Sequence, residues 1–438
     1  MRISLPVVLL LVMLAIPAVP HLSAANAADD WEKWLAKLPL EQRDAWQDYL
    51  QRSQRQSQLY RALIAAEVEA YALQQTTAAP EGPSYFREAL AKPLDWYRTD
   101  EARRRADIAV SFQFPVGGWS KGIDLATRPR RPGELHSAAD NWRWLATFDN
   151  GSTYLHMRFI ARAFQATDEP YYRDSFLRGL RFILRSQYPN GGFPQIYPLE
   201  GGYHDHITFN DNAMVGVLVL LRDIAQEEPG FDFVDAPTRE LVKRALERAT
   251  DCVVNMQVRV NGRRTAWCAQ HHCITLEPVG ARSYELPSLS GDESVGIVRF
   301  LMSLDNPGKE VIEAVQAAVR WLDEVKLDNT SMVRVPKQDK ENYPRGFDHV
   351  VMTGPEYGPS WARFYEIGTN RPMFVGRDGV VKHDLAEVEY ERRTGYRYMG
   401  EWAHRLLQEE YPGWQARWSP HKNVLKKSSG AHRRLISN

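Results

Sequence analysis

Two Asp-Asn pairs stand directly before apolar helical segments of the chain, Asp149-Asn150 and Asp211-Asn212. An Asp or Asn at such a place usually accepts hydrogen bonds from the first amides of the helix, so one pair alone is typical of a helix cap. Two Asp side chains held in one site are also what acid–base cleavage of a glycosidic bond requires. The residue types alone leave capping and catalysis open.

Several cations occupy short motifs outside the helical segments. Lys121 follows Gly-Gly-Trp, and Arg282, Arg363 and Arg377 lie in the second half of the chain. Guanidinium groups bind carboxylates through paired hydrogen bonds, which a site for neutral sugars would not need. The 55 Lys and Arg balance the 55 Asp and Glu, so net charge argues against nucleic-acid binding. We therefore expect an acidic ligand that is held by locally clustered cations.

Helical periodicity dominates the elements that must position these residues. Residues 28–104 are interpreted as an N-terminal helical region that contains a hairpin, with apolar residues at Trp31, Trp34, Leu35, Leu38, Leu59, Leu63, Ala66 and Ala70. Amphipathic segments recur later, at 154–165, 171–187, 213–224, 236–258, 293–303, 311–325 and 386–408. Strand-like alternation is scarce.

Glycine-rich turns divide the later segments into similar units. Gly117-Gly118-Trp119 and Gly191-Gly192-Phe193 resemble each other, and glycine pairs turn the chain sharply. Repeated helix–loop units favour an inner and an outer ring of helices, which predicts an all-α fold for residues 105–417. We expect an (α/α) toroid whose loops form a cleft at one face.

The two ends of the chain have different compositions. Residues 1–27 combine Arg2, an apolar run and small residues before Ala28, a pattern typical of a signal peptide, so we expect an exported, mature protein. The basic, Ser-rich residues 418–438 are predicted to be disordered. Three cysteines are too few for a disulfide scaffold; packed thiols are the simpler interpretation, and a Cys268–Cys273 bridge stays open.

The order of the motifs resembles the pectate lyases of polysaccharide lyase family ten through most of residues 105–410. The segments that carry this resemblance are GGWSK at 117–121, TFDNG at 147–151, GGFPQ at 191–195, ITFNDNAM at 207–214, TAWCAQH at 265–271, ARSYE at 281–285, SLSG at 288–291, WARFY at 361–365, NRPMF at 370–374, GRDG at 376–379 and ERRTGY at 391–396. The resemblance implies an (α/α) toroid and calcium-dependent anti-β-elimination of polygalacturonate.

The resemblance also assigns roles to residues. It implies that Asp149, Asn150 and Asp211 hold calcium, which prefers such hard oxygen ligands. It implies that Arg377 is the Brønsted base, although guanidinium groups normally stay protonated, so a carboxylate clamp is the alternative role. Arg282 and Arg363 match arginines that bind uronate carboxylates, and Lys121 is a further candidate substrate contact; these complete the predicted site.

The same residues allow two other functions, and one residue departs from the family pattern. A glycoside hydrolase could use Asp149 and Asp211 as its acid pair, and a non-catalytic uronate-binding protein would keep the arginines but need no base. The chain has His271-His272 where relatives commonly have His-Asp, and adjacent histidines make a poor metal pair. We expect a monomeric lyase.

Overall fold

The computed structural model describes residues 31–82, 86–138 and 145–425. The predicted signal peptide at 1–27 lies outside the described residues, as does the predicted disordered tail (418–438) from residue 426 onward. For residues 418–425 the prediction of disorder is wrong, because Val424 and Leu425 pack against the core and Ser419 accepts a hydrogen bond from Gln316 Nε2 at 2.7 Å. None of the described helices has the length and apolar composition needed to cross a membrane.

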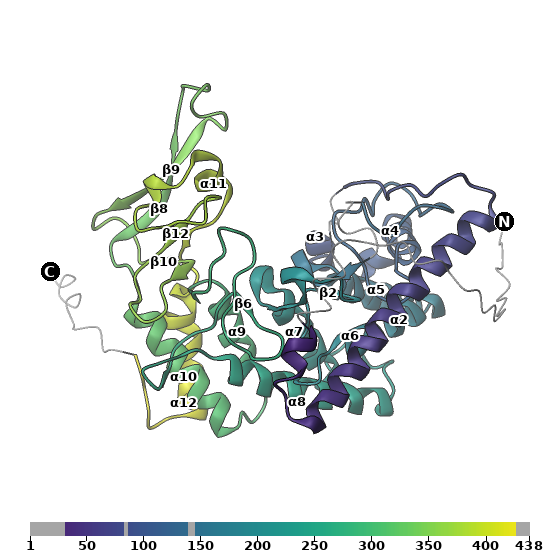
Figure 1. Ribbon diagram of the computed structural model, residues 1–438, viewed down its shortest axis with the longest axis horizontal. Coiled ribbons are helices and arrows are strands. Elements are labelled where there is room, and N and C mark those ends of the chain that lie inside the picture. Colours follow the sequence, from purple (N-terminus) through teal and green to yellow (C-terminus); the bar gives the residue numbers. More distant parts are fainter. Residues whose placement is uncertain (1–30, 83–85, 139–144, 426–438) are drawn as a thin grey trace.

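The long helices between residues 100 and 324, labelled in Figure 1, fall into two rows by their mutual contacts. The first row is α4 (Asp100–Ser111), α6 (Pro170–Ser186), α8 (Ala236–Met256) and α10 (Lys309–Glu324), and the second is α5 (Tyr154–Thr167), α7 (Ala213–Ala225) and α9 (Glu293–Met302). Helices contact their neighbours within each row and across the two rows. The second row lies inside because its sequences, such as that of α7, are apolar almost all round. The fold is mainly helical, as predicted.

The predicted boundaries of these helices are accurate. The periodic segments from 154–165 through 311–325 match α5 to α10 within two residues at each end. A repeated pair of hydrogen bonds joins the helices of the first row. After each of three of these helices, the Nε2 of a glutamine donates to a carbonyl of its own turn and to a carbonyl of the next first-row helix. The sequence had only partly revealed this repeat. The bonds are Gln113 to Gly117 O (2.6 Å) and Ser175 O (2.9 Å), Gln187 to Gly191 O (3.0 Å) and Ala245 O (2.8 Å), and Gln257 to Thr265 O (3.0 Å) and Ala314 O (2.9 Å).

The glycine pairs let these turns touch the next helix. Gly117 and Gly191 have positive φ angles of 124° and 93°. A Cβ atom on Gly117 would lie 2.4 Å from the carbonyl oxygen of Arg178, and one on Gly191 would lie 2.2 Å from that of Arg248. A larger residue would therefore separate the turn from the helix, so the predicted sharp turns are confirmed.

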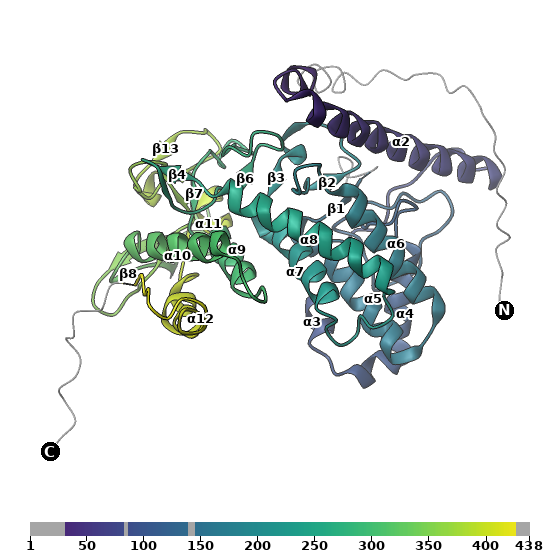
Figure 2. The ribbon, with the colours of Figure 1, turned by 90° about the horizontal axis from the view of Figure 1, so that it is seen from below.

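The predicted N-terminal hairpin is wrong. After a short helical turn at 31–35, one helix, α2 (Leu40–Ala70), runs along the side of the helical rows (Figure 2). The predicted apolar stripe is confirmed before α2, where Trp31 and Leu35 are buried, but misplaced on α2, where Leu59 and Leu63 are 49% and 43% exposed. The buried stripe contains Trp46, Tyr49 and Tyr60, because large rings fill the interface while their polar atoms find partners, such as Tyr49 Oη donating to Ser186 O at 2.9 Å.

Short helices complete the described chain. They are α3 (Phe86–Leu90), η1 (Leu94–Arg98), η3 (Asp149–Gly151), η4 (Gly202–Asp205), η5 (Asn210–Asn212), η6 (Leu385–Glu387), α11 (Tyr390–Gly395), the π-helical η7 (Leu406–Glu410) and α12 (Tyr411–Trp418). The helix predicted at 386–408 is therefore wrong. Its middle is interrupted by β14 (Met399–Gly400), which pairs with β10 (Trp361–Ala362), because Gly395 ends α11 and Tyr396 after it lies in extended backbone.

Antiparallel strand pairs tie the loops together. The two-residue pairs are β1 (Ala146–Thr147) with β2 (Ile196–Tyr197), β3 (Ile207–Thr208) with β6 (Gln270–His271), β4 (Arg259–Val260) with β5 (Arg263–Arg264), β7 (Leu289–Ser290) with β11 (Phe364–Tyr365), and β12 (Phe374–Val375) with β13 (Val381–Lys382). A longer hairpin, β8 (Thr330–Pro336) with β9 (Phe347–Thr353), projects from the C-terminal part of the chain (Figure 1). The sequence analysis missed it. The three cysteines are free and buried, so the packed-thiol interpretation is confirmed and Cys268–Cys273 is not a bridge.

Candidate active site

The candidate site is built where the inner helices α5, α7 and α9 begin. The short helix η3 leads into α5, η5 leads into α7, and Glu293 is the first residue of α9. η3 contacts η5, and η5 contacts α9, so the three helix starts are neighbours. Helix N-termini favour negative charge, because unpaired amides and the helix dipole point toward it. This end of the helical rows is therefore suited to acidic side chains.

The two Asp-Asn loops share one backbone turn, but in a register that the sequence did not suggest. Asn150 (φ 52°, ψ 24°) and Asp211 (φ 53°, ψ 26°) both adopt the left-handed conformation, each two residues after a phenylalanine. Asp149 therefore corresponds to Asn210, and Asn150 to Asp211. Each loop thus offers one carboxylate and one amide. Neither Asp149 nor Asp211 caps the helix that follows, because the cap positions are Thr153 and Asn212, without side-chain cap bonds.

Asp149 is a buried carboxylate, and one of its two oxygens has no hydrogen-bond partner within the described residues. Its side chain is 6% exposed, and Oδ2 contacts the Lys121 ammonium and accepts a hydrogen bond from Asn150 Nδ2 at 3.2 Å. Oδ1 is buried and has no hydrogen-bond partner within the described structure. A buried carboxylate oxygen rarely stays unpaired, so Oδ1 is suited to a cation or an incoming donor.

Asp211 supplies the second carboxylate. Oδ2 accepts a hydrogen bond from Asn210 Nδ2 at 2.8 Å, and Oδ1 lies 3.9 Å from Arg363 Nη2. Burial raises the pKa of Asp211; Arg363 opposes this effect, whereas the negative charge of Asp149 adds to it. Two carboxylates this close together gain from a divalent cation between them.

The donor set therefore fits a hard cation such as calcium. No cluster of three or more His, Cys, Asp or Glu side chains suited to a metal occurs within residues 31–82, 86–138 and 145–425. An ion at Asp149 and Asp211 would need further oxygens from the Asn150 amide, the backbone, water or a ligand. Calcium accepts such mixed oxygen ligands.

Arg363 is the most enclosed of the predicted arginines. Its guanidinium is 8% exposed; Nε donates to Glu293 Oε1 at 3.1 Å, and Nη2 donates to Asn210 Oδ1 at 3.0 Å. This buried pair joins the start of α9 to the η5 loop. In this arrangement Arg363 positions Asp211, and direct contact with a substrate carboxylate stays a prediction.

Arg282 and Arg377 are more accessible, and each also holds a carboxylate. Arg282 Nε donates to Glu285 Oε2 at 2.8 Å, and Arg377 Nε donates to Glu391 Oε2 at 2.8 Å. Both guanidiniums lie near the Tyr284 ring, with Cζ-to-centroid distances of 4.8 and 5.9 Å. The Glu391 carboxylate raises the pKa of Arg377, whose side chain is 59% exposed. In this state Arg377 is a charged guanidinium paired with an acid.

The fold brings the predicted residues into one region. Lys121, Asn150 and Asp211 surround Asp149. Burial lowers the pKa of His204 to about 4, and the charges of Asp149, Lys121 and Arg282 also act on it, so His204 belongs to the same region. The roles of the residues in catalysis remain predictions.

Sequence reasoning missed the carboxylates that pair with the arginines. Glu285 lies three residues after Arg282 in a motif that was recognised, and Glu391 begins another, so local signals existed for both. Glu293 gave no such signal, because its bond to Arg363 spans 70 residues.

The His271-His272 pair is structural. Cys268 N donates to His271 Nε2 at 3.0 Å, and Ile274 N donates to His272 Nδ1 at 3.1 Å. The His272 ring also meets the Trp34 ring edge-on at 4.3 Å. The two rings have different hydrogen-bond partners, as expected for adjacent residues. His272 thus contacts the N-terminal segment in place of the acidic residue that is common in relatives.

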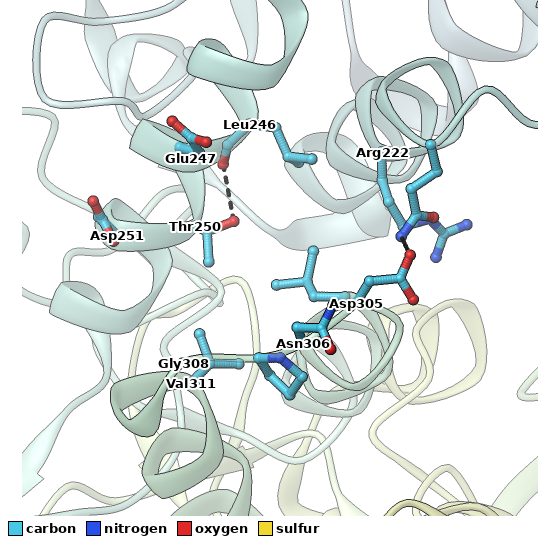
Figure 3. A pocket seen from close by; sticks show the side chains of 12 residues that line it. Arg222, Leu246, Glu247, Thr250, Asp251, Asp305, Asn306, Gly308 and Val311 are labelled. Carbon is cyan, nitrogen blue, oxygen red and sulfur yellow. Dashed lines mark hydrogen bonds between the residues drawn. The ribbon is translucent and has the colours of Figure 1, made fainter. Parts of the chain in front are cut away.

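A separate pocket lies at the far ends of the helices. It has a volume of about 490 Å³ and is lined by residues of α8 and of the turn between α9 and α10, including Thr250, Asp251 and Asp305 (Figure 3). None of the predicted site residues lines it. The acid–arginine region, rather than this pocket, carries the chemistry predicted from sequence.

Comparison with known proteins identifies the family. The family model for pectic acid lyases matches residues 113–407. The chain belongs to the pectic acid lyase family. It is similar to a family 10 polysaccharide lyase from Cellvibrio cellulosa, with 33% identity over 73% of this chain and 95% of that chain, and a TM-score of 0.62.

A mutant of the Cellvibrio cellulosa family 10 lyase, solved in complex with trigalacturonic acid, is 32% identical over 74% of this chain and 96% of that chain, also with a TM-score of 0.62. No curated protein matches the chain. Together the family match and these structures show that this pectic acid lyase family member is a polysaccharide lyase, as the sequence predicted.

Proposed function

We propose that the protein cleaves polygalacturonate by calcium-assisted anti-β-elimination and leaves a 4,5-unsaturated galacturonate end. The observation that carries this proposal is the convergence of two acids, the buried Asp149 and the more exposed Asp211, with the accessible arginines Arg282 and Arg377. The Cellvibrio cellulosa structure with trigalacturonic acid supports an acidic polysaccharide substrate.

Asp149, Asn150 and Asp211 are the proposed calcium ligands, and the unpartnered Oδ1 of Asp149 is the strongest support for this assignment. A calcium ion bound there supplies positive charge that neutralises a uronate carboxylate while carbanion character develops at C5. Lys121 holds the other oxygen of Asp149 and presents an ammonium to the same region.

Arg282 and Arg377 act on the substrate directly in this proposal. Arg282 exchanges its bond to Glu285 for a bond to a uronate carboxylate, which keeps the guanidinium paired. Arg377, after giving one guanidinium proton to water, removes the C5 proton with the freed nitrogen lone pair; the C5–H electron pair forms the C4–C5 double bond, the C4–O bond breaks, and the departing oxygen takes a proton back from solvent. Because Glu391 raises the pKa of Arg377, proton removal requires that the substrate first displace Glu391.

The proposal also includes the fold, the export and the oligomeric state of the protein. The two helical rows are part of an (α/α) toroid with the substrate cleft at its loop face. The chain is exported through the signal peptide at residues 1–27 and acts as a monomer. The repeated glutamine bonds between first-row helices support the toroid, because each repeat adds one helix pair in the same orientation.

Incubation with polygalacturonate, with and without a calcium chelator, tests the proposal. We expect ultraviolet absorbance of an unsaturated product to appear with calcium and to be lost with chelator. Asp149→Ala and Asp211→Ala should raise the calcium concentration needed for half-maximal activity while circular dichroism shows a folded protein. Products without a double bond would instead support the hydrolase alternative, and full activity of both variants in chelator would place calcium elsewhere.

A further inference from the structure

We propose that Arg345 and Arg392 form a second carboxylate-binding subsite over Gly395, beside Arg377, which binds a uronate residue of a longer substrate away from the scissile bond. This inference rests on the proposed function, because it assigns the substrate class. It concerns the surface where α11 meets the β8–β9 hairpin (Figure 1).

The two guanidiniums converge on one point of bare backbone. A Cβ atom built on Gly395 would lie 3.0 Å from Arg392 Nη2, 3.1 Å from Arg345 Nη2 and 3.3 Å from Arg345 Nη1. Gly395 itself is exposed, so the place where the guanidiniums meet is open to solvent. Two like charges at such close range favour an anion that bridges them.

Arg392 is held rigidly with unused hydrogen-bonding capacity. Its side chain is 10% exposed, and its Cζ lies 4.7 Å from the Tyr284 ring centroid and 5.4 Å from that of Tyr396. Nε is buried and has no hydrogen-bond partner within the described residues, and the ion pair with Glu391 is long, at 3.6 Å. The stacked rings preorganise this guanidinium, so little rotational freedom is lost when it binds a carboxylate.

Arg345 reaches the same point from the turn between β8 and β9. Its Nη1 donates to Thr394 O at 3.0 Å, and its backbone N–H donates to Tyr390 Oη at 3.2 Å. These bonds fix the arginine against α11 while the residue stays exposed. Arg345 therefore supplies an accessible charge at a defined position, next to the enclosed Arg392.

The local charge balance is positive. Glu391 faces three guanidiniums: its hydrogen bond with Arg377 lowers its pKa most, and the charges of Arg392, Arg377 and Arg345 lower it further. The neighbouring Arg393 is already paired with Asp348, with Nη2–Oδ2 at 2.8 Å, and adds no free charge. Two carboxylates, Glu391 and Glu389, thus face three cations, which leaves room for a carboxylate of the substrate.

The position of the subsite specifies its occupant. Arg392 and Arg377 both lie over the Tyr284 ring, so the subsite continues the row of arginines that begins at Arg282. A polyuronate carries a carboxylate on each sugar and can contact successive arginines with one chain. We therefore assign the subsite to a galacturonate of the same polymer rather than to a free inorganic anion.

The test compares Arg345→Gln and Arg392→Gln with Arg244→Gln, a matched loss of charge on the exposed face of α8. Affinity for polygalacturonate is measured by electrophoresis in gels that contain the polymer, which needs no cleavage. Each subsite variant should bind about tenfold more weakly, as loss of one charged hydrogen bond predicts, and the control should bind as wild type. Equal retardation of all four proteins would overturn the proposal.

A second variant keeps the test valid if Arg392→Gln does not fold. Gly395 has no positive φ angle, so Gly395→Ala strains no backbone but pushes the two guanidiniums apart. It should lower the ratio of kcat/KM on polygalacturonate to that on trigalacturonate about tenfold, as Arg345→Gln should. An unchanged ratio in both variants would refute the subsite.

Two further results distinguish this subsite from the proposed lyase activity and from a site that binds any small anion. If wild-type protein releases no unsaturated product but its retardation in the gel depends on Arg345, the subsite stands and the lyase proposal fails. If inorganic phosphate at millimolar concentration abolishes the difference between wild type and Arg345→Gln, the site binds any small anion and the galacturonate assignment is wrong.

Discussion

Replacement of Lys121 by Gln tests where calcium binds, because it should tighten calcium binding in the absence of substrate. The Lys121 ammonium holds Oδ2 of Asp149, while Oδ1 is unpartnered. A calcium ion at Oδ1, with the usual calcium–oxygen distance of about 2.4 Å, would stand about 5 Å from the ammonium. The repulsion between charges of +2 and +1 at that separation is about 1.7 kcal/mol even with the dielectric constant of water, and larger in a partly buried site.

The expected result is a calcium dissociation constant about tenfold or more below that of wild type. Isothermal titration calorimetry at low ionic strength measures it, since salt would screen the effect. Lys309→Gln is the control, because Lys309 is exposed on α10 and removes the same charge far from the acid pair. An unchanged or weaker calcium affinity in Lys121→Gln would show that calcium does not bind at Asp149 Oδ1.

Three further predictions follow from individual side chains. Arg377→Lys should lower turnover at least about 100-fold if Arg377 is the base, whereas a rise in KM alone would make it a carboxylate clamp. Arg363→Ala should destabilise the protein by roughly 3–5 kcal/mol in urea unfolding, because Glu293 stays buried and unpaired; a loss below about 1 kcal/mol would contradict the buried pair. Burial raises the pKa of Asp205 to about 7, so its carboxylate costs stability progressively as the pH rises from about 4 to 7. Asp205→Asn should therefore be up to about 4 kcal/mol more stable than wild type at pH 8 and equal to it at pH 4, and parallel pH profiles would refute the assignment.

Local patterns in the sequence were sufficient for the inner helices, and they pointed to Asp149 and Asp211, whose loops the fold brings together. The apolar sequence of α7 defines both its length and its buried position. Asp149 and Asp211 stand in motifs that can be recognised from the sequence without the fold. The register of their two loops was not predictable, because it depends on which residue adopts a left-handed backbone, and both Asn and Asp tolerate that conformation.

The failures have a common physical origin in tertiary contacts. Periodicity favoured Leu59 and Leu63 as the buried face of α2, but the hydroxyl of Tyr49 meets a carbonyl on α6 and decides the orientation of the helix. The segment 386–408 has the composition of a charged helix, yet Met399 pairs with Ala362 in a strand. Propensity gives way when distant residues supply better partners.

The carboxylates that pair with Arg282 and Arg377 have a consequence for the size of ligand that the site can retain. A single free galacturonate that replaces Glu285 exchanges one carboxylate for another and gains little. A polymer behaves differently, because once one sugar has displaced an internal acid, the next carboxylate is tethered at high effective concentration beside the next guanidinium. Under the proposed function, the internal acids therefore select ligands by the number of their carboxylates: monomers and salt anions should exchange rapidly, while a chain long enough to reach several arginines at once should remain bound.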